Sequence, residues 1–187
     1  MRFLEVITIS THEDKTVGRL TEIIALQCGV CSSKAKQIRT AAALHDIGKQ
    51  RIPAEILNKP GKLDAHEFEI IKTHTTLGAE ILVSIQGELG VMARECCLYH
   101  HEWFDGKGYW GRRIGDLPYY LQYVAISDVF AALISERPYK HAWPPAEAVQ
   151  YIQSKAGTQF DPELVEIFLT AIRSDSRIPA IFMERVM

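Results

Sequence analysis

The stretch that decides the fold is Ala42-Ala43-Leu44-His45-Asp46-Ile47-Gly48-Lys49. Its alanine-rich first half continues an apolar pattern that predicts a helix from Lys34 to about His45. A histidine and an aspartate then stand together at the end of this helix, where adjacent side chains point about 100° apart. Such a pair can hold one cation from two sides or give one ligand to each of two cations. We therefore expect a metal site on a helical scaffold.

Helical periodicity extends on both sides of this stretch and predicts an all-α protein. The expected helices cover residues 3–28, 34–45, 54–57, 64–74, 89–101, 118–134, 145–154, 161–172 and 178–187. Asp64 and Glu67 have the spacing of a capping box, and Gly78 marks either a helix end or a close helix crossing. The sequence has no strand-like alternation and no internal repeat. Residues 1–187 are thus predicted to form a single helical domain.

The overall charge argues against several classes of partner. Twenty-one Lys and Arg face 23 Asp and Glu, which gives a net charge of −2. This balance does not indicate a surface for polymeric nucleic acid or for a membrane. No apolar run reaches the roughly 18 residues that a membrane span needs, and the apolar start lacks a cleavage site for a secretion signal. We expect a cytoplasmic protein.

The four cysteines allow two interpretations. Cys28 and Cys31 have the C-x-x-C spacing of a redox pair or of half a zinc site, but no second such pair follows. Cys96 and Cys97 lie inside an apolar helical stretch. We interpret all four as reduced thiols, two of them in the core.

Further candidate metal ligands lie far along the sequence from His45-Asp46. His100-His101 ends another expected helix, and Asp128 interrupts an apolar one, where a charge is costly unless it is compensated. Each residue alone is more often a satisfied core group than a ligand, but together they favour a metal site. Residues 102–117, rich in glycine, form a long loop of the kind that is often functional.

Several other short stretches, together with the candidate ligands, form an ordered set of motifs along the chain. They are Ile52-Pro53, residues 56–61, Lys72-Thr73-His74, Gly78, Glu102, residues 105–109, Arg137-Pro138-Tyr139-Lys140 and Phe160-Asp161-Pro162. On this set the chain resembles the HD-GYP family, a branch of the HD metal-dependent phosphohydrolase superfamily, from about His12 to Phe168. The resemblance implies an HD-domain bundle of about seven to nine helices.

The resemblance also implies a metal centre and a reaction. Its metal ligands would be His12, His45, Asp46, His74, His100, His101 and Asp128. They would hold two divalent transition-metal ions, iron or manganese first, with nickel or zinc as alternatives. A hydroxide bridging the two ions would hydrolyse a cyclic dinucleotide, with cyclic di-GMP as the first choice. Asp46 and Lys49 would be the catalytic residues.

Substrate contacts follow from the same resemblance. Lys49 would bind a phosphate oxygen, and Arg137 with Lys140 would contact a guanine or the second phosphate. Tyr109 and Trp110 would line the substrate site. Glu102 and Asp105 would organise the 102–117 loop, which in the family also contacts signalling partners.

The sequence departs from the family pattern at three positions. Trp110 replaces the signature proline, so it either stacks on a base or packs internally. Thr8 replaces a glutamate that holds a third metal in some members, which predicts two ions. Ala131 replaces a common aspartate, which puts base preference in question.

These departures leave two alternative functions open. One is an HD-type phosphohydrolase acting on another nucleotide or phosphoester, and the other is a catalytically weak module that binds a cyclic dinucleotide in signalling. No regulatory domain fits before His12, so we expect either a stand-alone domain or a fragment of a longer protein.

Overall fold

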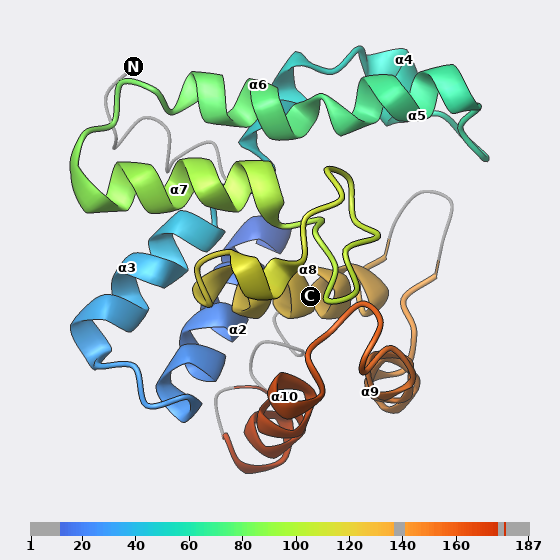
Figure 1. Cartoon of the computed structure of the whole chain (residues 1–187). Coiled ribbons are helices and arrows are strands. Elements are labelled where there is room, and N and C mark those ends of the chain that lie inside the picture. The colour runs from blue at the N-terminus through green and yellow to red at the C-terminus, as the bar shows by residue number, and fades with distance from the viewer. Residues whose placement is uncertain (1–11, 137–140, 176–177, 179–187) are drawn as a thin grey trace.

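The described part of the chain is helical, which confirms the all-α prediction. The computed structural model describes residues 12–136, 141–175 and 178 (Figure 1). Its α-helices are α2 (His12–Gln27), α3 (Ser32–Ala42), α4 (Ala54–Leu57), α5 (Ala65–Lys72), α6 (His74–Ile81), α7 (Gly87–Tyr99), α8 (Tyr120–Leu133), α9 (Pro145–Ser154) and α10 (Pro162–Ser174), with two 3-10 helices, η1 (Ile47–Arg51) and η2 (Ile114–Asp116). None of the described helices is long and apolar enough to cross a membrane.

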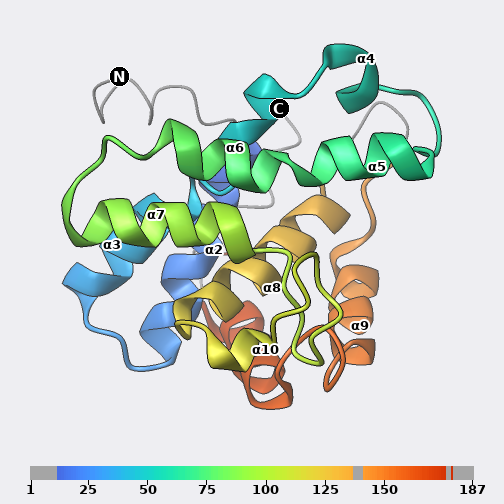
Figure 2. The same cartoon turned by 45° about the horizontal axis from the view of Figure 1, so that its top comes forward.

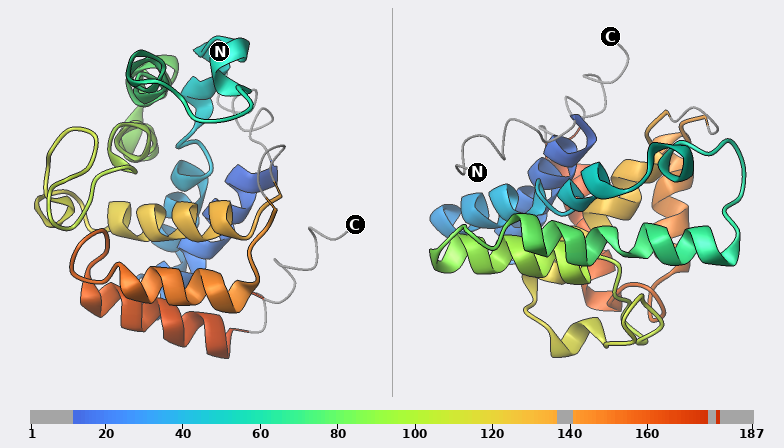
Figure 3. Two further views of the ribbon diagram at one scale, coloured as in Figure 1. Left: turned by 90° about the vertical axis from the view of Figure 1, so that its right-hand side faces the viewer. Right: turned by 90° about the horizontal axis from the view of Figure 1, so that it is seen from above.

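Helix α8 is the centre of the bundle. The views in Figures 2 and 3 place α7 and α10 on opposite sides of it, with α4 and α5 at the edge farthest from α10. Every residue from Leu121 to Ser127 is buried, as expected for a helix that is apolar on all sides. Asp128 follows directly, so its carboxylate is held next to the protein interior.

The deciding stretch folds differently from the helix end that we expected. Helix α3 ends at Ala42 rather than near His45, and a turn leads into η1. Gly48 explains the tight geometry, because a Cβ there would lie 1.9 Å from the His74 carbonyl oxygen and 2.5 Å from the Gly78 nitrogen. Only a glycine lets η1 approach the backbone of α6 so closely.

Three expectations about the next helices are resolved by the structure. The capping box is confirmed, since the Glu67 amide donates to Asp64 Oδ1 at 2.9 Å and the Asp64 amide donates to Glu67 Oε2 at 2.8 Å. The helix does not continue through His74 but breaks at Thr73. Gly78 is a close crossing and not a helix end, because a Cβ there would lie 3.0 Å from Cys97 Sγ.

For the remaining helices, the predicted and the observed bounds differ mainly at the helix ends. Helix α7 ends at Tyr99, so His100 and His101 follow the helix, and residues 102–117 form the expected loop with η2 inside it. All four cysteines are free thiols; Cys96 and Cys97 are buried as predicted, and Cys31 is exposed. The expected terminal helix over residues 178–187 falls, apart from residue 178, outside the described residues.

Candidate metal centre

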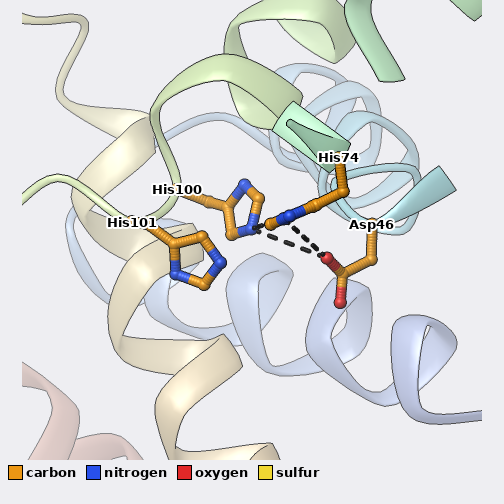
Figure 4. Close-up of side chains that lie close together, drawn as sticks. All are labelled: Asp46, His74, His100 and His101. Carbon is orange, nitrogen blue, oxygen red and sulfur yellow. Dashed lines mark hydrogen bonds and ion pairs between the residues drawn. The ribbon is translucent and has the colours of Figure 1, made fainter. Parts of the chain in front are cut away.

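Four side chains from three separate segments converge on one point. Asp46, His74, His100 and His101 each offer one ligand atom within 4.8 Å of the others (Figure 4). The Asp46 Oδ1 atom lies 3.3 Å from His74 Nε2 and 3.7 Å from His100 Nε2. Segments that are far apart in sequence therefore present one carboxylate and three imidazoles to a common point.

Two further groups share residues with this first one. His45 and Asp128 group with His100, and Asp14 groups with His45 and Asp46. His45 Nε2 lies 3.3 Å from Asp46 Oδ2 and 3.4 Å from Asp128 Oδ1. The two oxygens of Asp46 thus face different imidazoles. The overlapping groups of ligands can therefore hold cations at two adjacent positions.

Hydrogen bonds to the backbone orient three of the histidines. The Nδ1 atoms of His45, His74 and His100 lie 2.8, 2.6 and 2.8 Å from the carbonyl oxygens of Ala42, Ile71 and Cys96, respectively. A carbonyl only accepts, so each Nδ1 must carry a proton, and in the neutral imidazole each Nε2 then has a free lone pair. Metal-binding histidines are commonly held in this way.

The facing nitrogen atoms provide a test of whether a cation fits. His74 Nε2 and His100 Nε2 lie 3.3 Å apart, and in these tautomers neither carries a hydrogen to donate to the other. His45 Nε2 and Asp46 Oδ1 are buried without a hydrogen-bond partner. Buried lone pairs that face each other are unfavourable unless a positive charge lies between them. The donor set therefore fits divalent cations.

Burial and charge set the protonation of the cluster. Burial, followed by the neighbouring histidines, lowers the pKa of His100 well below its usual value. Burial likewise lowers the pKa of His101 to about 4, so both imidazoles are neutral and ready to coordinate at neutral pH. Burial alone would lower the pKa of His45, but the carboxylates of Asp46 and Asp128 outweigh it and raise that pKa. The raised pKa favours a second proton on His45 Nε2 when no cation is bound, so a cation and this proton compete for the same nitrogen atom.

Lys49 lies at the edge of the cluster, where the sequence placed it. Its ammonium group forms an ion pair with Asp46 Oδ2. Burial would raise the pKa of Asp46, but the charges of Lys49 and His45 hold it well below its usual range. Lys49 is partly exposed, so a ligand entering the site can reach its ammonium group.

Glu102 organises the glycine-rich loop, as the sequence suggested. Its carboxylate is buried and accepts the backbone N–H groups of Trp110 and Arg112, both at 2.7 Å. Between Glu102 and Trp110 the chain folds back so closely that a Cβ at Gly108 would lie 2.5 Å from the His101 carbonyl oxygen. As a result, the Tyr109 ring lies over the His101 ring with 4.3 Å between their centroids.

The neighbouring Trp110 points to a different partner. Its indole N–H donates to the Leu98 carbonyl oxygen of α7 at 3.0 Å, while 48% of the residue stays exposed. The indole nitrogen thus makes a contact within the protein, while the exposed part of the ring stays open to a ligand. Asp105 accepts the Lys107 amide at 3.1 Å within the same loop.

The structure does not describe every residue that the sequence nominated. The side chain of His12 and residues Thr8, Arg137 and Lys140 lie outside the described residues. Ala131 is fully buried in α8. Asp14 was missed by the sequence reasoning, because one acidic residue near the start of an amphipathic helix gives no signal that separates it from a surface carboxylate.

The helical fold and this cluster define a class of all-α proteins built to hold divalent cations. The HD domain family matches residues 7–164, and the chain belongs to this family. The resemblance found in the sequence is confirmed by this match and by curated relatives that are named as cyclic di-GMP phosphodiesterases.

The chain is 42% identical over 163 residues to a cyclic di-GMP phosphodiesterase of Thermotoga maritima, covering 86% of this chain and 44% of the relative. It is 39% identical over 163 residues to 3'3'-cGAMP-specific phosphodiesterase 2 of Vibrio cholerae, covering 83% of this chain and 31% of the relative. An HDG"Y"P protein from Bdellovibrio bacteriovorus shares the fold with a TM-score of 0.70 at 19% identity, covering 88% of this chain and 53% of that one. The chain thus spans less than half of these curated relatives.

Proposed function

We propose that this domain is a metal-dependent phosphodiesterase that hydrolyses a cyclic dinucleotide, with cyclic di-GMP as the first candidate. The observation that carries the proposal is the convergence of Asp46, His74, His100 and His101 beside His45 and Asp128. The names of the curated relatives supply the substrate class.

The cluster suits two cations rather than one. Asp46 presents its two oxygens to different histidines, and two overlapping groups meet at His100. Imidazole with carboxylate suits iron and manganese, and also nickel and zinc. Two bound divalent cations would supply a water of lowered pKa and positive charge for the phosphate oxygens.

The chain's own residues position the substrate around that centre. The Lys49 ammonium group, paired with Asp46, is placed to bind a non-bridging phosphate oxygen. Tyr109 covers His101 and shields that side of the centre from water. Trp110, Arg137 and Lys140 complete the proposed substrate contacts.

We also propose the cytoplasm as the compartment and the 102–117 loop as the contact for a signalling partner. Four free thiols support a reducing compartment. Arg112 and Trp110 are exposed on the loop, and both residue types are frequent in protein interfaces.

The decisive experiment is turnover by the purified protein loaded with Mn²⁺ or Fe²⁺, with metal content measured on the same sample. Cyclic di-GMP should be converted to the linear dinucleotide or to GMP. Absence of turnover with every cyclic dinucleotide tested, at full metal occupancy, would refute the proposal. A preference for nucleoside monophosphates would instead support a different phosphohydrolase.

A further inference from the structure

Helix α5 carries an exposed aromatic side chain beside the metal centre. Phe68 is 43% exposed, although burial of a phenylalanine side chain is among the larger stabilising contributions that a residue can make. No residue of α5 is buried, and the helix lies with α4 at the edge of the bundle (Figures 1 and 3). The core of the domain therefore does not require an aromatic ring at this position.

The contacts of Phe68 connect it to the site. Its ring lies 5.8 Å from the Tyr109 ring, nearly perpendicular to it at 82°. Tyr109 in turn lies over His101, and its centroid is 6.5 Å from that of His74. Phe68 is thus separated from the candidate metal ligands by a single aromatic ring.

A second side chain holds the Phe68 ring in place. The ammonium group of Lys72, one turn further along α5, lies 5.7 Å from the centre of the ring, which is the range of a cation–π contact. Lys72 is itself held by an ion pair with Glu69 at 2.7 Å. The ring is therefore braced by Lys72 and Tyr109 while much of its surface remains accessible.

The position suits a base more than a phosphate. A phosphate bound at the histidine–aspartate cluster would bring its sugar and base next to the cluster, and Tyr109 and Phe68 form one side of that surrounding surface. A flat, braced and accessible ring is what a purine can stack on, and stacking on an aromatic ring tolerates different bases. The positive charge of Lys72 is already paired with Glu69, so the aromatic face is the main recognition element offered here.

We propose that Phe68 is a substrate-binding residue that stacks on a purine base of the cyclic dinucleotide. This inference rests on the proposed phosphodiesterase function. It adds a recognition element on α5, next to Tyr109 of the glycine-rich loop. It also predicts that Phe68 acts on substrate affinity and not on the bond-breaking step.

The test measures KM and kcat for cyclic di-GMP with Phe68→Ala and Phe68→Trp, each with its metal content. Phe68→Ala should raise KM on the order of tenfold and leave kcat and metal content unchanged. Phe68→Trp should have a KM close to that of the wild type, because the indole ring can also stack on a base. The fluorescence of the added indole should be quenched when a phosphorothioate analogue of the dinucleotide binds.

Tyr119→Ala is the matched control, because Tyr119 is 44% exposed and also packs perpendicular to another ring, that of Tyr123 at 5.3 Å. Its KM should equal that of the wild type. An active wild type with unchanged KM in Phe68→Ala would overturn this inference alone, as would a loss of metal or of kcat. A wild type inactive on all cyclic dinucleotides would overturn the proposed function and this inference together.

Discussion

The metal centre and the rim around it are built in different ways. The centre, formed by His45, Asp46, His74, His100, His101 and Asp128, rests on segments whose backbones touch at Gly48 and Gly78. The rim, formed by α5 and the 102–117 loop, has exposed aromatic residues, and the Glu102 carboxylate helps to hold the loop by accepting the backbone N–H groups of Trp110 and Arg112. Changes in the centre should therefore abolish function, whereas changes in the rim should tune it.

Asp46→Ala should have the largest effect on activity. It removes the carboxylate that faces three imidazoles and pairs with Lys49. Turnover should fall on the order of a thousandfold or more, and metal should no longer be retained after gel filtration. Steady-state kinetics and elemental analysis measure both quantities, and a variant that keeps its metal would contradict the assignment of Asp46.

Gly48→Ala should have the second-largest effect, because it disrupts the backbone contact between η1 and α6 without removing a ligand side chain. The added methyl group would meet the His74 carbonyl oxygen, and overpacking of this kind costs about 1–3 kcal/mol. Thermal unfolding should show a lower Tm, and metal affinity should fall. Gly115→Ala is the control, since nothing lies within 4 Å of a Cβ there; equal effects at both positions would argue against the contact.

Lys49→Ala tests whether Lys49 contacts the substrate or helps to hold the metal ions. Loss of one charged contact to the phosphate should lower kcat about a hundredfold while metal content stays intact. The control is Lys62→Ala, an exposed lysine outside the cluster. If metal is lost together with activity, Lys49 serves the metal site and not the phosphate.

Glu102→Gln tests the rim. A carboxamide can accept only one of the two backbone N–H groups, from Trp110 and Arg112, that the carboxylate now accepts. The unpaired group should cost about 1–3 kcal/mol locally, so amide hydrogen exchange at these two residues should accelerate. Exchange in α8 should not change, and a global acceleration would mean that Glu102 supports the whole fold.

The smallest expected effect is the release of a proton from His45 when the metal binds. The pKa of His45 is raised in the folded, metal-free protein by Asp46 and Asp128, so this proton stabilises the fold below the unfolded pKa and the stabilisation is lost as pH rises through the folded pKa. Metal uptake below the folded pKa should release about one proton at His45. Calorimetry in buffers of different ionisation enthalpy measures this release, and zero release at pH 6 would contradict it.

The sequence predicted the helical class and five of the converging residues, because paired ligands in apolar helices are costly without a cation. His74 entered only through the family resemblance, since a single histidine near a helix end has no distinctive pattern. The break at Thr73 and the early end of α3 at Ala42 were not predicted. Both depend on the close approach of η1 to α6, a long-range contact that local propensity does not encode.

The buried and exposed cysteines have a practical consequence. Burial raises the pKa of Cys97, which also donates to the Leu44 carbonyl oxygen, so this thiol beneath the centre stays protonated and unreactive. Exposed Cys31 has the opposite character, because hydrogen bonds from Ser33 and from the backbone at the start of α3 lower its pKa. A maleimide dye should therefore attach selectively at Cys31, giving an optical reporter on the folded protein that leaves the residues of the metal centre unmodified.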